Sequence, residues 1–424
     1  MIASAHAPHE LAATITGAAA ATTLWHAVVV GAGPAGAAAA WRLATAGLRV
    51  LLVDRHALPR GKVCGCCLST RAVRELDALG PAALPDAAIP LDTVRLAHRG
   101  RCTAIPLPAG RVVSRETLDL HLVRQAIAAG CHWLPGITVA ALHDSEDPDA
   151  SAVELEATVA GGASPRSLSI RAAVVVLATG LADHVRITGG NATAEREPRR
   201  IAPRSRIGVG GALAASACDL PAGELVMAVG NGGYCGIVRL DDGRLDVAAA
   251  LDRAAVAREA DPARAVARLL DEAAGGMAGH LPAADAILGA AFRATPALTR
   301  HAPLASGAAR RIFRVGDAAG YVEPFTGEGM GWALASSRLL AESLLSAGGL
   351  RSPVEAAARY LAAHRREFAS LHARCRAVAE GLRRPTLVAA AVAAARAMPW
   401  AARRIVPAMI GANLCLPPSA GGGR

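Results

Sequence analysis

The stretch LWHAVVVGAGPAG, residues 24–36, decides the fold of this chain. Its first half is an unbroken apolar segment with the length of a buried strand, and it runs directly into a glycine-rich turn. The alanine-rich segment that follows (37–47) favours a helix, with Gly47 as its C-cap. The next apolar run, RVLLVDR (49–55), has the pattern of a second buried strand. This order predicts a β-α-β unit at the front of the chain.

The glycine turn has the spacing of a dinucleotide-binding motif. Gly31, Gly33 and Gly36 fit GxGxxG, and Asp54 ends the second strand. The glycines permit a tight turn and a close backbone approach, the helix N-terminus faces a pyrophosphate, and the acid accepts hydrogen bonds from ribose hydroxyls. FAD and NAD(P) use the same mechanics, so this motif leaves the choice between them open.

A second glycine cluster, VGDAAGYVEPFTGEGMG (315–331), favours FAD. Asp317 follows an apolar strand, and a glycine-rich loop precedes the helical pattern at 332–349. Backbone N–H groups at such a helix start are suited to hold a second part of one extended ligand. A pure NAD(P)-binding module would not need this cluster. The alternative reading is a surface loop followed by a helix.

The remaining pattern divides the chain into two lobes and a tail. Residues 114–130 read as a helix with Ser114 as N-cap, and the region 200–300 contains short strand candidates between Gly and Asp turns. The predicted fold is therefore α/β: a Rossmann-type FAD-binding domain, three-layered with a mostly parallel sheet, a mostly antiparallel β substrate domain, and a C-terminal helical tail. The predicted boundaries are 1–23 for a loosely ordered leader, 24–80, 110–184 and 305–350 for the discontinuous FAD-binding domain, 81–109 and 185–304 for the substrate domain, and 351–424 for the tail.

Composition excludes several other classes. The formal charge is +10, but the arginines are scattered and the aromatic content is only 3%, which argues against nucleic acid as a partner. Nine cysteines without a framework spacing fit reduced thiols in the cytoplasm. The first 23 residues lack the features of a signal peptide, and the longest apolar helical run (386–395) is too short to span a bilayer.

Four segments together resemble a known family. GAGPAG with Asp54, RGKVCG (60–65), SRETLD (114–119) and GDAAGYVEPFTGEGMGWAL (316–334) resemble the FAD-dependent oxidoreductases of the p-hydroxybenzoate hydroxylase superfamily, and within it the geranylgeranyl-reductase-like subgroup. The resemblance implies an FAD cofactor and NAD(P)H as electron donor. The residues expected to bind the cofactor are Gly31, Gly33, Ala35, Gly36, Asp54, Arg55, Arg60, Lys62, Cys64, Gly65, Arg115, Gly180, Gly316, Asp317, Pro324, Gly327, Gly329 and Met330.

The sequence departs from the family at two places. The superfamily carries an Asp-Gly pair after its late strand, where this chain has Thr179 and Gly180. The reductase subgroup has a tryptophan after its Gly-Tyr pair, where this chain has Cys235 and Gly236 after Tyr234. The identity of the substrate is therefore not transferred from the family.

Lys62 is the only lysine of the chain and stands beside Cys64, Cys66 and Cys67. An ammonium group is a compact charge that can be desolvated, so one hypothesis is that Lys62 holds the loop or tunes the flavin, and the other is a solvated loop lysine. By resemblance Cys64 lines the reaction chamber, and the alternative is a set of packing cysteines. No metal site is predicted, because the cysteines lack a partner pair at zinc-binding spacing.

Four residues are candidates for chemistry: Cys64, Lys62, Tyr234 and Glu328. Tyr234 offers a phenol, and Glu328 or Glu323 a carboxylate, as proton donors, although each is equally credible as a loop hydrogen-bonding group. The expected reaction is monooxygenation (hydroxylation) of a hydrophobic aromatic, polyketide-like or isoprenoid small molecule. Reduction of a C=C bond, as in geranylgeranyl reductase, is the alternative, and a non-catalytic flavin-binding protein is a third reading.

The tail offers a second kind of contact. Trp400, Arg403 and Arg404 stand next to apolar Ile405, Val406, Met409 and Ile410, a pattern suited to lie on a membrane surface. The alternative is an ordinary packed C-terminal helix. A cytoplasmic protein with peripheral membrane contact is the resulting expectation.

Overall fold

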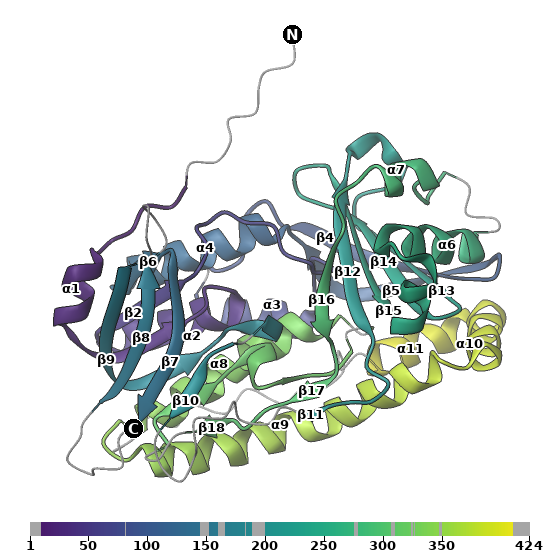
Figure 1. Ribbon diagram of the computed structural model, residues 1–424. Helices are drawn as coiled ribbons and strands as arrows, with labels where there is room; N and C mark the ends of the chain where they lie inside the picture. Colours follow the sequence, from purple (N-terminus) through teal and green to yellow (C-terminus); the bar gives the residue numbers. More distant parts are fainter. Residues whose placement is uncertain are drawn as a thin grey trace.

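Two β-sheet lobes lie side by side, and the long helix α9 (Pro353–Gly381) runs beneath both of them (Figure 1). This computed structural model describes residues 10–80, 82–144, 152–159, 166–182, 184–188, 200–274, 279–306, 310–323, 325, 327–346 and 350–409.

The first lobe is built on a sheet whose centre is parallel. Its strands are β1 (Leu24–Val30), β2 (Val50–Asp54), β6 (His132–Pro135), β7 (Ile137–Asp144), β8 (Val153–Val159), β9 (Arg166–Leu177), β10 (Arg186–Thr188), β18 (Ala305–Ser306) and β19 (Ile312–Arg314). Strand β1 pairs in parallel with β2 and β9, while β7, β8 and the first half of β9 are antiparallel.

Successive side chains of β1 point to opposite faces of this sheet, and both faces are buried. Ala27 and Val29 belong to the core under helices α2 (Pro34–Thr45), α4 (Arg115–Ala128) and α8 (Gly329–Leu345). Val28 and Val30 belong to the core on the opposite face, with residues of β7 and β8. The continuous apolar run seen in the sequence is thus explained by burial on both faces.

The second lobe is a mostly antiparallel sheet. Its strands are β3 (Cys67–Leu68), β4 (Ile89–His98), β5 (Arg101–Val112), β12 (Ile207–Leu213), β13 (Glu224–Gly230), β14 (Gly233–Arg239), β15 (Leu245–Leu251) and β16 (Arg293–Ala297). Val266 and Leu269 of helix α6 (Pro262–Ala274) pack against one face. The predicted fold class, with a mostly parallel FAD-binding sheet, a mostly antiparallel second sheet and C-terminal helices, is confirmed.

The remaining elements before the C-terminal helices are short. They are α1 (Gly17–Thr22), α3 (Thr70–Asp77), α5 (Arg253–Glu259), α7 (Ala284–Leu288), the 3-10 turns η1 (Gly180–Ala182), η2 (Ala215–Ala217) and η3 (Gly316–Ala318), and a small sheet of β11 (Arg200–Ile201), β17 (Arg300–His301) and β20 (Gly320–Tyr321).

The C-terminal helices pack on both lobes. Tyr360 of α9 is buried and its hydroxyl donates to the carbonyl of Arg314, 2.8 Å away. Helices α10 (Pro385–Ala397) and α11 (Pro399–Met409) contact β5 (Figure 1). Within the described ranges, no helix combines the length and the apolar character needed to cross a membrane.

The structure corrects three expectations. Residues 10–23 are not a loose leader, because α1 buries Ala20, and Thr14 exchanges hydrogen bonds with the backbone of Trp133; residues 1–9 lie outside the described part. The strands expected at 167–172 and 172–180 are one strand, β9, because its first half pairs with β8 and its second half with β1. Strand β10, assigned by sequence to the substrate domain, pairs with β7 in the first sheet.

Candidate active site

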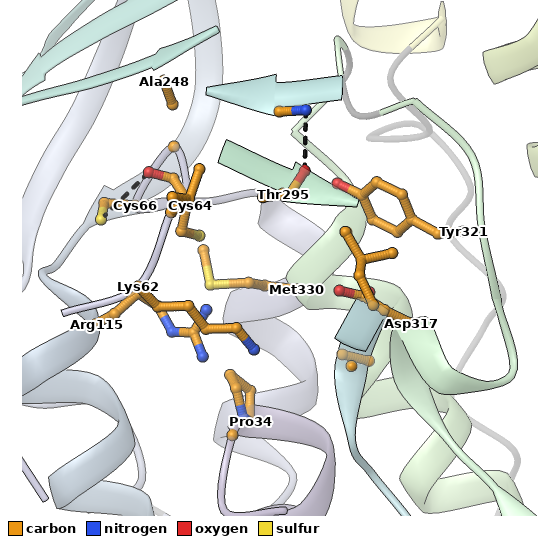
Figure 2. A pocket seen from close by; sticks show the side chains of 18 of the residues that line it. Pro34, Lys62, Cys64, Cys66, Arg115, Ala248, Thr295, Asp317, Tyr321 and Met330 are labelled. Atoms are coloured by element: carbon orange, nitrogen blue, oxygen red, sulfur yellow. Dashed lines mark hydrogen bonds between the residues drawn. The ribbon is translucent and has the colours of Figure 1, made fainter. Parts of the chain in front are cut away.

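A cavity of about 830 Å³ lies between the two sheets. Its lining comes from the glycine turn after β1, the segment from Arg60 to Thr70, strands β13 to β15, and the start of α8. Figure 2 shows the side chains that converge on it, among them Lys62, Cys64, Arg115 and Asp317. Segments that are far apart in the sequence therefore form one site.

The glycine turn leaves no room for side chains. Gly31 has a φ of 108°, and a Cβ there would collide with the carbonyl of Ala178. A Cβ on Gly36 would collide with the carbonyl of Gly31, so this glycine lets α2 pack tightly against the turn. These are the close approaches that the GxGxxG spacing predicts.

One buried arginine lies beside the N-terminus of α2. Gly33 caps the helix without a side-chain hydrogen bond, and its Cβ position is 3.4 Å from Nη2 of Arg115. Arg115 donates to both carboxylate oxygens of Asp119, at 2.9 and 2.7 Å. Burial works against the charge, but the ion pair with Asp119 raises the pKa of Arg115 above its ordinary value. A fixed guanidinium beside a helix N-terminus fits the diphosphate of FAD.

Asp54 lines the cavity and anchors the turn around it. Its Oδ2 accepts from the backbone N–H of Ala32 at 2.8 Å and from Nη2 of Arg60 at 2.9 Å, and its Oδ1 accepts from the N–H of His56 at 2.9 Å. The ion pair with Arg60 was not foreseen from the sequence. Because Arg55 and Arg60 also line the cavity, a ribose at Asp54 would lie among positive charges.

The lone lysine reaches into the cavity. Nζ of Lys62 lies 3.3 Å from the position that a Cβ on Gly180 would take, and Gly180 has a φ of 68°. Desolvation, and then the charge of Arg115, lower the pKa of Lys62, while Asp317 opposes the shift. The side chain of Lys62 is solvent-exposed at the cavity, so it is available to a cofactor there, and both hypotheses for this residue stand.

The second glycine cluster packs directly against the first. Gly316 has a φ of 60°, and a Cβ there would lie 2.9 Å from Cβ of Ala35 in the α2 turn. Asp317 lines the cavity next to it, and burial raises the pKa of its carboxyl. Gly327, Gly329 and Met330 also line the cavity, whereas the predicted Pro324 lies outside the described residues.

Cys64 carries an activated thiol on the cavity wall. A hydrogen bond from the Cys66 thiol, and then the charge of Arg115, lower the pKa of Cys64 to about 5, although burial opposes this. Gly65 lines the same wall. These contacts favour the thiolate form of Cys64 over that of Cys66 and Cys67, whose pKa values are raised.

Tyr234 and Glu328 bring two acids to the cavity. Tyr234 is buried, its hydroxyl has no hydrogen-bond partner among the described residues, and burial raises its pKa well above the usual value. Its ring lies edge-on to Phe325, with centroids 5.0 Å apart. Glu328 is buried 3.5 Å from Nε of Arg71, and burial raises the pKa of its carboxyl to about 7. All four residues predicted for chemistry thus line one cavity.

Sequence reasoning missed two groups near the site. Asp246 of β15 is buried, and in the described part of the chain its Oδ2 has no hydrogen-bond partner; burial, followed by the charge of Cys64, raises its pKa well above the usual value. An acid in the apolar run LDVAAAL (245–251) was the available signal. Arg206 lies under the Tyr234 ring and pairs with Glu323 and Asp252.

The far end of the cavity is apolar. The residues that the second sheet and its surroundings contribute are mainly aliphatic or aromatic: Leu91, Val94, Leu96, Ile105, Leu107, Leu225, Met227, Ala248, Ala250, Leu298 and Phe325. The charged lining residues gather mainly at the glycine-turn end, so the cavity has a polar cofactor end and an apolar end.

Comparisons with known proteins agree with this architecture. Residues 25–152 match the FAD binding domain family. Menaquinone reductase of Mycolicibacterium smegmatis is 29% identical over 336 residues, which cover 76% of each chain. Geranylgeranyl diphosphate reductase of Rhodobacter capsulatus is 37% identical over 126 residues, covering 28% of this chain and 30% of that protein.

A solved structure shares the fold. The crystal structure of pqsL, a probable FAD-dependent monooxygenase from Pseudomonas aeruginosa, has a TM-score of 0.62 at 20% identity and covers 87% of this chain and 99% of that one. At this identity the likeness shows the fold alone. The resemblance drawn from the sequence motifs is confirmed: the chain is an FAD-dependent oxidoreductase with the FAD binding domain, and its fold and relatives are those of the p-hydroxybenzoate hydroxylase superfamily.

Proposed function

We propose that this protein reduces a C=C bond in a hydrophobic isoprenoid molecule. The observation that carries the proposal is the division of the cavity into a charged end at the glycine turn and an apolar end in the second sheet. An apolar chamber of this kind favours an aliphatic chain, because it offers few partners to polar groups. The two reductases that resemble the chain in sequence support the choice of reaction.

Reduction of a C=C bond adds a hydride to one carbon and a proton to the other. Reduced FAD, when bound, supplies the hydride. Arg115 and the N-terminus of α2 would hold its diphosphate, Asp54 its adenosine ribose, and Asp317 its ribityl hydroxyls. The chain itself orients the substrate and supplies the proton.

Tyr234 is the residue that we assign as proton donor. Its phenol is protonated at neutral pH and its side chain lines the apolar part of the cavity, while the hydroxyl oxygen is buried without a hydrogen-bond partner among the described residues. Phe325 and Arg206 hold the ring from two sides, so the hydroxyl is presented in a fixed position. Glu328, with a pKa of about 7, is a second acid that can hold a proton in the same cavity.

A reduced nicotinamide dinucleotide is the electron donor that we propose. Arg55, Arg60 and Arg293 come from both lobes and line the cavity near its charged end. Guanidinium groups of this kind suit the phosphates of NADH or NADPH.

Hydroxylation is the second candidate. The observation in its favour is the same apolar chamber, whose aliphatic and aromatic lining would keep water away from a flavin held at the glycine-turn end.

Peripheral contact with a membrane would give the protein access to such a substrate. Leu387, Met398 and Trp400 are exposed apolar residues on α10, α11 and their junction, and Arg403 and Arg404 are exposed beside them. Basic and apolar groups together fit the headgroup region of an anionic bilayer.

One anaerobic experiment separates these functions. The flavoprotein is reduced with NADPH or NADH and mixed with a polyprenyl quinone or a polyprenyl diphosphate without oxygen. Reoxidation of the flavin, with two hydrogens added to the polyprenyl chain itself as located by fragment mass analysis, is the expected result, since reduction of the quinone ring alone leaves the chain unchanged. Reoxidation only by oxygen, with one oxygen atom added to the probe, would establish hydroxylation instead. No product under either condition would favour a non-catalytic flavin-binding protein.

A further inference from the structure

Two thiols meet on the cavity wall. Cys64 and Cys66 are separated by Gly65, and all three residues line the cavity. Cys66 has a φ of 52°, a left-handed conformation that turns its side chain back along the loop. Its Sγ lies 3.8 Å from the carbonyl oxygen of Cys64, as Figure 2 shows. The loop thus brings the second sulfur back towards the residue that carries the first.

The surroundings give the two sulfurs different characters. The Cys66 thiol donates to the carbonyl oxygen of Cys64, and its side chain, followed by the buried guanidinium of Arg115, lowers the pKa of Cys64, so Cys64 ionises more readily than Cys66. Hydrogen bonding to Cys64, together with burial, raises the pKa of Cys66 and keeps it protonated. A thiolate beside a protonated thiol is the arrangement in which one sulfur attacks an oxidant and the other resolves the product.

The neighbouring thiol is placed differently. The backbone of Cys67 is fixed in β3, where it pairs with Val112 of β5. Burial, with the charge of Asp246, raises the pKa of Cys67 far above its ordinary value. Cys67 is therefore a built-in control for the reactivity of the pair.

We propose that Cys64 and Cys66 are a peroxide-reactive pair that closes into a disulfide on the cavity wall. The Cys64 thiolate attacks one oxygen of hydrogen peroxide, the O–O bond breaks, and Cys64 becomes a sulfenic acid as hydroxide leaves and is protonated to water. The Cys66 thiol then attacks that sulfur, the S–O bond breaks, and the hydroxyl leaves with the Cys66 proton as a second water. Two thiols are oxidised and one peroxide is reduced.

The oxidant has a source in the same cavity. A reduced flavin that meets oxygen without transferring it to a substrate releases hydrogen peroxide. This inference needs only the FAD site, and it holds whether the protein reduces a C=C bond or hydroxylates its substrate. Closure would remove the Cys64 thiolate that faces Arg115 and the cavity.

Peptide mass analysis tests the pair. The holoprotein is treated with hydrogen peroxide, remaining thiols are blocked under denaturing conditions, and the tryptic peptide 63–71 is weighed. For the wild type we expect a peptide that has lost two hydrogens and in which the reagent has blocked only one thiol. The Cys67→Ser variant should show the same loss with no thiol left to block, and reducing agent should reverse both.

The remaining variants assign the roles. In Cys66→Ser, Cys64 should stop at the sulfenic acid, which a dimedone probe traps. In Cys64→Ser, no crosslink should form. A crosslink that persists in Cys64→Ser or vanishes in Cys67→Ser would overturn the assignment, and so would oxidation of wild-type Cys64 directly to sulfinic acid. Should either serine variant at 64 or 66 fail to fold, the comparison of wild type with Cys67→Ser still decides.

Discussion

The guanidinium carbon of Arg206 lies 5.5 Å from the centre of the Tyr234 ring. Arg206 is fully buried and is held there by Glu323 and Asp252. The cation thus supports the face of a ring that lines the cavity, and the buried hydroxyl has no hydrogen-bond partner within the part of the chain that the structure describes. The position of the phenol is therefore set on one side by residues that do not line the cavity, and on another by Phe325, which does.

Replacement of Tyr234 by Phe removes the proposed proton donor and keeps the ring. We expect kcat to fall about 100-fold, the lower end of the range for loss of a general acid, with little change in KM or in FAD content. Steady-state and single-turnover kinetics measure this, with whichever polyprenyl probe the wild type reduces in the anaerobic experiment. Tyr321→Phe, which removes another phenol from the same cavity, should have the smaller effect. Equal kinetics for wild type and Tyr234→Phe would exclude Tyr234 as the donor.

Replacement of Lys62 by Met removes a cation from the cofactor end of the cavity. A positive charge stabilises the anionic reduced flavin, so its loss should lower the two-electron reduction potential by on the order of 30 mV, or about 1.4 kcal/mol. Spectroelectrochemistry of the purified flavoprotein measures the shift. Lys62→Arg keeps the charge and serves as the matched control. A potential that is the same in all three proteins would show that Lys62 does not act on the flavin.

Two histidines should make stability depend on pH. His364 and His372 lie in an aromatic cluster with Phe368 and Trp332, where burial lowers the pKa of each to about 4. Because the unfolded chain binds these protons at about pH 6.5, the free energy of unfolding should decrease between pH 6.5 and 4 and level off below. The loss should be on the order of 2 kcal/mol for each histidine, reduced by their partial exposure.

Urea unfolding at several pH values isolates this effect. Glu328 and Asp317 have raised pKa values, so their contribution to the free energy of unfolding is lost as the pH rises. The pH dependence of the wild type alone would therefore mix the effects of the histidines and of the carboxyl groups. The difference between wild type and His364→Phe cancels the carboxylates. As the pH falls from 6.5 to 4, the wild type should lose stability relative to His364→Phe. A difference in the free energy of unfolding that does not depend on pH would contradict the prediction.

The membrane contact predicts binding to anionic vesicles. Sedimentation with phosphatidylglycerol vesicles should carry down the full chain, and Trp400→Ser with Arg403→Gln and Arg404→Gln should reduce the bound fraction about tenfold. Arg253→Gln with Arg258→Gln changes two exposed arginines of α5 and is the matched control. If all three proteins stay in the supernatant, or all bind equally, the surface formed by α10 and α11 is not a membrane contact.

Local patterns predicted the cofactor end of the site well. The GxGxxG turn, the helix with Ser114 as its N-cap, and the strand before Asp317 follow from short-range spacing and propensity. Ser114 does accept a hydrogen bond from the N–H of Thr117, as the pattern requires.

Long-range contacts could not be predicted in this way. Asp246 lies near Cys64 because β15 and the loop before β3 meet at the cavity, and no local signal in either segment gives that approach. The ion pair between Asp54 and Arg60 and the packing of residues 10–23 on the first sheet likewise depend on how the chain returns to itself. The apolar segments showed that strands exist, but not where β9 changes from one partner to the other.

Strand β3 has only two residues, yet it ties the loop that carries Lys62 and Cys64 to the sheet of the second lobe. The backbone N–H of Val113, after β5, donates to the carbonyl of Cys66 at 3.1 Å and extends this seam. A substitution that shifts β5 to admit a new substrate therefore also shifts the cofactor loop. The substrate range and the position of the flavin-side loop therefore depend on the same backbone contacts. A redesign of the substrate pocket through β5 will also have to restore the position of that loop.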